Sequence, residues 1–95
     1  YKFEITEEQT AVLTLAEEVS FLNKVPIQQK LYSLPRSVEK VVINGENSKF
    51  IDKDVLEVLK DFEQNAMSKG LAIELQEVTY KRKSVRSKNK LQKIV

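Results

Sequence analysis

The acidic side chains are the first candidates for chemistry in this sequence, because several of them occur close together. Glu7-Glu8 and Glu17-Glu18 are adjacent carboxylates, and Asp52 and Asp54 flank a single lysine. Paired carboxylates can act as a general acid and base or bind a cation. The two glutamate pairs fall where strands are expected to meet turns, without a loop of oxygen-ligand spacing. We therefore interpret them as solvated turn charges and predict no metal site.

The composition removes most catalytic chemistry. The chain of 95 residues contains no His and no Cys. Without His it lacks the usual general base at neutral pH and the imidazole metal ligand, and without Cys it lacks disulfides and thiolate nucleophiles. Neither of the glycine-rich phosphate-binding motifs, GxGxxG or GxxxxGK[ST], occurs. We therefore predict a non-enzymatic domain with no catalytic residues and no cofactor.

Length and hydropathy predict one globular domain. With 41% apolar and 32% charged residues, the chain is rich enough in apolar side chains to build a modest core. Its longest apolar run is only a few residues, far short of the roughly 20 that span a bilayer. The chain begins at Tyr1 inside an expected strand, with no initiator Met and no signal-peptide layout. We expect it to be a domain of a longer protein.

The charge is divided unevenly along the chain. Residues 1–80 hold nine basic and all fourteen acidic residues, a net charge of −5, whereas residues 81–95 hold seven basic and no acidic residues, a net charge of +7. We expect residues 1–80 to form the domain and 81–95 a basic C-terminal tail. The tail is expected to be a solvated end; the alternative is contact with anionic lipid headgroups or an acidic protein face. Tyr80 is the only aromatic residue nearby, so we predict no nucleic-acid binding.

Hydrophobic periodicity predicts the first half of the fold. Alternating residues predict a strand over 1–5, and a nearly continuous apolar run predicts a strand over 11–16 that is covered on both faces, the two forming a hairpin. A short helix is expected from Asn23, as its N-cap, to Leu34. A β-branched strand over 38–43 should follow, closed by the turn signal Asn44-Gly45.

The second half continues the alternation of strands and helices. Asp52 or Asp54 is the expected N-cap of a second helix that ends at Lys69-Gly70, and a last strand is expected over 71–75. The order is β-β-α-β-α-β. Because crossovers join parallel strands, we predict a small α/β sandwich with one mixed sheet, in which the first strand is antiparallel and the core strands are parallel.

Partners and ligands of such sheets meet the loops at the carboxyl ends of the strands. Two segments qualify, the turn at 21–24 and the loop at 44–54. The second leads into a helix N-terminus, which favours anions, but Asp52 and Asp54 already bring negative charge there and are expected to cap the helix. Lys53 between them should be exposed. Phe50 is either a core residue under the second helix or an exposed aromatic contact.

The ordered segments resemble the STAS domain, the module shared by sulfate transporters and anti-sigma-factor antagonists. The resemblance runs from about residue 10 to residue 78 and is carried by the sequences VSFLNK at 19–24, VVING at 41–45 and FIDKDVL at 50–56. It is nearest to the cytoplasmic C-terminal domain of bacterial SulP-type inorganic anion transporters. The antagonist branch carries a phosphorylatable Ser or Thr after the residue that matches Asp52, where this chain has Lys53. That departure favours the transporter branch, and Ser48 is out of register with the switch.

The resemblance implies a regulatory and interaction domain on the cytoplasmic side of the inner or plasma membrane, in a transporter of sulfate or another inorganic anion. It implies as partners the transmembrane domain of the same protein, a second copy of the chain as a homodimer, or a carrier or regulatory protein. It also implies nucleotide binding near the 44–54 loop, where we expect weak binding or none because two carboxylates face the phosphate position. The alternative is a free-standing signalling protein of the antagonist type. The predicted partner-binding residues are Asn44, Gly45, Phe50, Asp52, Lys53 and Asp54.

Overall fold

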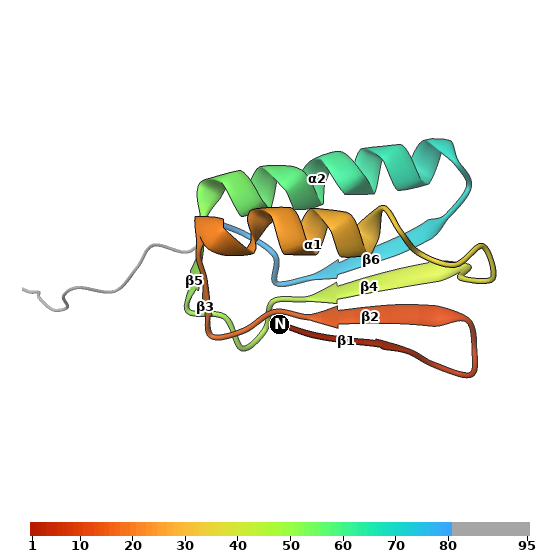
Figure 1. Ribbon diagram of the computed structural model, residues 1–95, viewed down its shortest axis with the longest axis horizontal. Helices are drawn as coiled ribbons and strands as arrows, with labels where there is room; N and C mark the ends of the chain where they lie inside the picture. Colours follow the sequence, from red (N-terminus) through yellow and green to blue (C-terminus); the bar gives the residue numbers. More distant parts are fainter. Residues whose placement is uncertain (81–95) are drawn as a thin grey trace, which may run out of the picture.

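The main sheet joins four strands in the order β1-β2-β4-β6, in a computed structural model that describes residues 1–80 (Figure 1). The strands are β1 (Lys2–Ile5), β2 (Thr10–Thr14), β4 (Lys40–Asn44) and β6 (Ala72–Gln76). Strand β1 is antiparallel to β2, and β2, β4 and β6 are parallel neighbours. The predicted mixed sheet is confirmed, and its four strands alternate with the two α-helices in the predicted order β-β-α-β-α-β.

Both helices, α1 (Lys24–Leu31) and α2 (Lys53–Ser68), cover the same face of this sheet (Figure 1). The topology explains why, because two crossovers of the same hand that step in one direction across a sheet leave their helices on one side. The prediction that the second strand is covered on both faces is therefore wrong. Ala11 and Leu13 are buried under the helices, whereas Val12 on the opposite face is only half-buried, and the strand ends at Thr14 instead of residue 16.

The hydrophobic core fills the space between the sheet and the two helices. Helix α2 contributes a stripe at helical spacing, so one of its faces is buried along its whole length. The residues of this stripe are Val55, Val58, Leu59, Phe62 and Ala66. The helix begins at Asp52, whose Oδ1 accepts a hydrogen bond from the Asp54 backbone N–H at 2.8 Å, and stops before Gly70, which has a left-handed φ of 77°. Of the two predicted caps, Asp52 and Asp54, the structure selects Asp52, and the predicted stop at Gly70 is confirmed.

A second, two-stranded sheet was not predicted. Strand β3 (Glu18–Val19) pairs in parallel with β5 (Phe50–Ile51). Strand β5 lies within the 44–54 segment, which was predicted to be a loop. The backbone N–H of Asp52 extends the pairing by donating to the Val19 carbonyl at 2.9 Å. This pairing ties the beginning of α2 to the segment that leads into α1.

The first helix begins directly after Asn23, as predicted, but it ends earlier than expected. A short 3-10 helix, η1 (Phe21–Asn23), precedes it, capped by Ser20. Asn23 occupies the predicted N-cap position of α1, but its side chain makes no capping hydrogen bond to that helix. Its Oδ1 instead accepts a hydrogen bond from the Ser20 backbone N–H at 2.9 Å. Helix α1 ends at Leu31 instead of Leu34, consistent with the bias of the residue before Pro35 away from helical backbone.

The third predicted strand also begins later than expected. Val38 is buried but lies in a turn, where its backbone N–H donates to the Pro35 carbonyl at 3.1 Å, and β4 starts at Lys40. Within residues 1–80, no helix is long and apolar enough to cross a membrane. The predicted basic tail at 81–95 lies outside the described residues.

Candidate interaction surface

The two segments predicted as separate candidates, 21–24 and 44–54, form one surface. Strand β3 leads through Ser20 into η1, and β5 leads through Asp52 into α2. Because β3 and β5 are parallel neighbours, the two helix starts lie side by side at one end of the molecule (Figure 1). We call residues 20–25 and 44–54 together the strand-end surface.

Backbone hydrogen bonds hold the 44–54 segment in place. The hydroxyl of Ser48, which is 5% exposed, donates to the Ala16 carbonyl at 2.6 Å. The backbone N–H groups of Lys49 and Phe50 both donate to the Glu17 carbonyl, at 2.7 and 3.2 Å. The segment is therefore anchored to the chain between β2 and β3, which gives the strand-end surface a defined shape.

Asn44 and Gly45, two of the predicted partner-binding residues, shape this surface more than they offer contacts. The Asn44 Oδ1 accepts from the Glu46 backbone N–H at 2.8 Å, which makes the turn after β4. Gly45 is buried, and its N–H donates to the Gln76 carbonyl at 2.8 Å. A Cβ on Gly45 would lie 2.8 Å from the carbonyl oxygen of Glu77, so only glycine permits this approach of the two backbones.

The three charged residues at the start of α2 take different positions. Asp52 is half-buried as the N-cap, while Lys53 and Asp54 are exposed, so the predicted exposure of Lys53 is confirmed. The Lys53 ammonium lies 5.6 Å from the centroid of the Tyr80 ring, a cation–π distance that brings the end of the described chain to this surface. No sequence spacing indicates this contact.

Large apolar side chains stand exposed beside these charges. Phe21 and Leu22 are 63% and 73% exposed, and Val25, one helical turn further, is 55% exposed. Because residues three and four apart share a helix face, these three form one apolar cluster. Phe50 is half-buried in β5, so it is neither a core residue nor an exposed contact. The sequence indicated the 21–24 turn but not Val25. Helix α1 also carries apolar residues on its buried face, so an apolar residue in this helix is not by itself a sign of an exposed contact.

The electrostatics of this end disfavour phosphate. Among the described residues, six carboxylates lie at this end against three lysines, an excess of negative charge that disfavours an anion. The acidic residues are Glu17, Glu18, Glu46, Asp52, Asp54 and Glu77, and the basic ones are Lys24, Lys49 and Lys53. In the described part of the chain, no group of three or more His, Cys, Asp or Glu side chains could hold a metal ion. The exposed groups of this surface are therefore the apolar side chains and a set of charged ones, Glu46, Lys49, Lys53 and Asp54.

Comparison with known proteins identifies the fold and no family. No protein-family model and no curated protein sequence matches the chain. A solved structure described as "Crystal Structure Analysis of Mglu" is similar, with a TM-score of 0.68 and 18% sequence identity over 80% of this chain. At that identity the likeness shows a shared fold alone. The chain spans about a fifth of that protein (19%), in which this fold is therefore one part of a longer chain.

Proposed function

We propose that this chain is a non-catalytic regulatory and interaction domain of the STAS type, in a SulP-type membrane transporter of sulfate or another inorganic anion. The observation that carries the proposal is the apolar cluster of Phe21, Leu22 and Val25, which stands exposed beside Lys53 on an anchored surface. Exposed apolar side chains gathered next to charged ones are typical of protein interfaces. The resemblance of residues 10–78 to SulP-type domains supports the choice of partner.

The expected partner is the transmembrane domain of the same transporter, and the resemblance to SulP-type domains implies a position on the cytoplasmic side of the membrane. The acidic field around Asp52 and Asp54 favours a protein partner over a nucleotide, because phosphate would be repelled there. Lys53 occupies the position at which the antagonist branch has its phosphorylatable hydroxyl. A permanent cation at that position supports constitutive docking instead of a phosphorylation switch.

Charge reversal on α2 tests the proposal. In the full-length protein, Lys53→Glu should lower anion uptake or assembly, whereas Lys60→Glu should not, because Lys60 is exposed about two turns further along the same helix. In the isolated chain Lys53→Glu should change the free energy of unfolding by no more than about 0.5 kcal/mol, since the lost contact with Tyr80 is offset by an acid near a helix N-terminus. A full-length Lys53→Glu protein that transports as well as wild type would contradict the docking role.

The apolar cluster gives a second, independent test. The double variant Phe21→Ser/Leu22→Ser should impair transport while the isolated chain stays folded, and Met67→Ser, which alters an equally exposed side chain near the far end of α2, should have no effect.

The coding sequence upstream of Tyr1 tests the transporter assignment itself. If it contains no series of apolar spans of roughly 20 residues, the free-standing signalling protein becomes the better hypothesis.

A further inference from the structure

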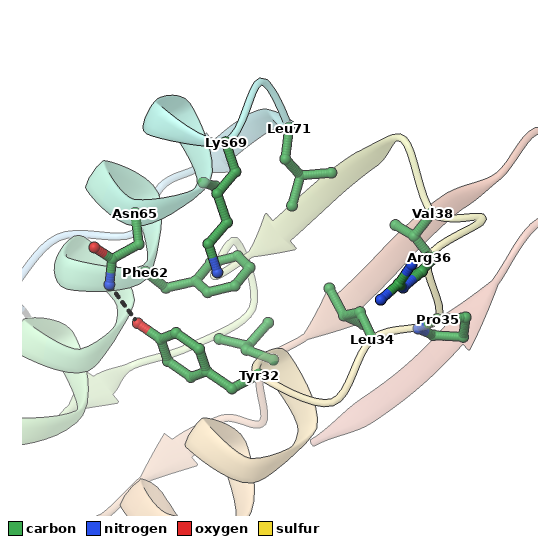
Figure 2. Close-up of a pocket in the computed structure, with 11 residues that line it drawn as sticks. Tyr32, Leu34, Pro35, Arg36, Val38, Phe62, Asn65, Lys69 and Leu71 are labelled. Carbon is green, nitrogen blue, oxygen red and sulfur yellow. Dashed lines mark hydrogen bonds between the residues drawn. The ribbon is translucent and has the colours of Figure 1, made fainter.

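A groove lies at the opposite end of the molecule, between the end of α2 and the segment that links α1 to β4 (Figure 2). It encloses about 180 Å³. Its floor is apolar, formed by the buried Leu31, Phe62 and Ala66 together with Leu71 at its edge. No pattern in the sequence indicates this groove, because it opens at the amino ends of the parallel strands, away from the loops where ligands of such sheets usually bind.

Two cations face this groove from different elements. Lys69 reaches in from the end of α2, and Arg36 points in from the α1–β4 link on the other side (Figure 2). Neither forms a salt bridge with any of residues 1–80. Glu39 does not line this groove, although it lines the adjoining hollow together with both cations. Unpaired cations beside an apolar floor favour a ligand that carries a negative group on an apolar body.

A fixed aromatic wall closes another side of the groove. The Tyr32 ring meets the Phe62 ring edge to face, with centroids 5.4 Å apart and an interplanar angle of 88°. The Tyr32 hydroxyl accepts a hydrogen bond from the Asn65 Nδ2 at 2.9 Å. Because that bond uses the oxygen of Tyr32, the hydroxyl hydrogen is free to donate to a ligand oxygen.

We propose that this groove binds a small organic carboxylate with an apolar body, about the size of benzoate. The volume suits such a ligand, since an engineered cavity of about 150 Å³ holds a benzene ring. The carboxylate lies between Arg36 and Lys69 and accepts hydrogen bonds from both, while the ring packs on Phe62 and Leu71. This site is distinct from the strand-end surface, and it does not depend on the transporter assignment.

The test is a titration of the ¹⁵N-labelled chain with three small molecules, followed by NMR. Comparing their affinities measures the contributions of the carboxylate and of the apolar ring separately. Benzoate should shift the amide signals of residues 31–38 and 62–71. Acetate lacks the ring and benzyl alcohol lacks the charge, so each should bind at least about tenfold more weakly, the factor that corresponds to one charge-assisted hydrogen bond or one buried apolar group. Equal affinity for benzoate and acetate, or for benzoate and benzyl alcohol, would overturn the proposal.

Substituting the two cations of the groove tests whether they bind the carboxylate of the ligand. Arg36→Gln and Lys69→Gln should each weaken benzoate binding about tenfold, while Lys60→Gln should leave it unchanged, because Lys60 is also exposed but lies outside the groove. Both groove cations are exposed, so the variants should keep the dispersed amide spectrum of the folded chain. Benzoate shifts that fall outside residues 31–38 and 62–71, or unchanged affinity in both Gln variants, would refute the site.

Discussion

Gly45 is the residue whose replacement should most directly disturb the strand-end surface. Its φ is not in the left-handed region, so backbone strain does not explain the glycine. The reason is space, because a Cβ would lie 2.8 Å from the Glu77 carbonyl oxygen and 3.4 Å from the Glu77 carbonyl carbon. Contacts of a Cβ below 3.0 Å essentially do not occur, so Gly45→Ala forces one of the two backbones to move.

The backbone around Glu77 has little freedom to give way. Gly45 donates its N–H to the Gln76 carbonyl at 2.8 Å, so separating the two segments stretches that hydrogen bond. Glu77 itself has a φ of 54°, in the left-handed region where residues other than glycine are rarely found. Overpacking of this kind costs about 1–3 kcal/mol. Because about 1 kcal/mol lowers the Tm of a domain this size by about 4–8 °C, we expect Gly45→Ala to lower the Tm by roughly 4–24 °C.

Circular dichroism during heating and during urea unfolding would measure this loss, with Gly70 as the control. Gly70 has a φ of 77° and nothing within 4 Å of its would-be Cβ, so Gly70→Ala should cost only the left-handed backbone strain, about 1 kcal/mol. Asn tolerates that conformation, so Gly70→Asn should recover part of the loss while Gly45→Asn should be worse than Gly45→Ala. A Gly45→Ala chain with the wild-type Tm would refute the steric argument.

Two further predictions concern side-chain hydrogen bonds elsewhere. Ser48→Ala removes the buried donor to the Ala16 carbonyl and should lower the free energy of unfolding by about 1–2 kcal/mol, measured in urea. The Gln76 amide, at 2.6 Å, and then Lys40, at 3.2 Å, hold the pKa of Glu74 below its ordinary value. The resulting stability is present above the ordinary glutamate pKa and is lost as pH falls through the lowered one. In that acidic window Glu74→Gln should therefore lose stability less steeply than wild type, and an equal slope in urea titrations would contradict this.

The elements that periodicity predicted correctly are the ones long enough to have a period. Helix α2 shows this best, because its buried stripe and its two end signals, Asp52 and Gly70, agree with one another. The coverage of the second strand was predicted wrongly for a physical reason. Val12 and Val42 are direct neighbours on the open face of the sheet, where each shields the other. Contacts of this kind between neighbouring strands account for an apolar run in the sequence although no helix covers that face of the sheet.

The strand-end surface could be predicted only in part, because the contacts that assemble it have no local pattern. The loops at the carboxyl ends of parallel strands must share an edge of the sheet, and this correctly indicated the segments 21–24 and 44–54. The pairing of β3 with β5 brings the two segments into contact. This pairing could not be predicted, because each strand has two residues, too few to show a period. Ser48 makes the same point, since its hydroxyl is bonded to a carbonyl 32 residues away and is buried. A kinase needs an exposed hydroxyl, so the buried Ser48 is an anchor of this surface, whereas Lys53 is exposed on it.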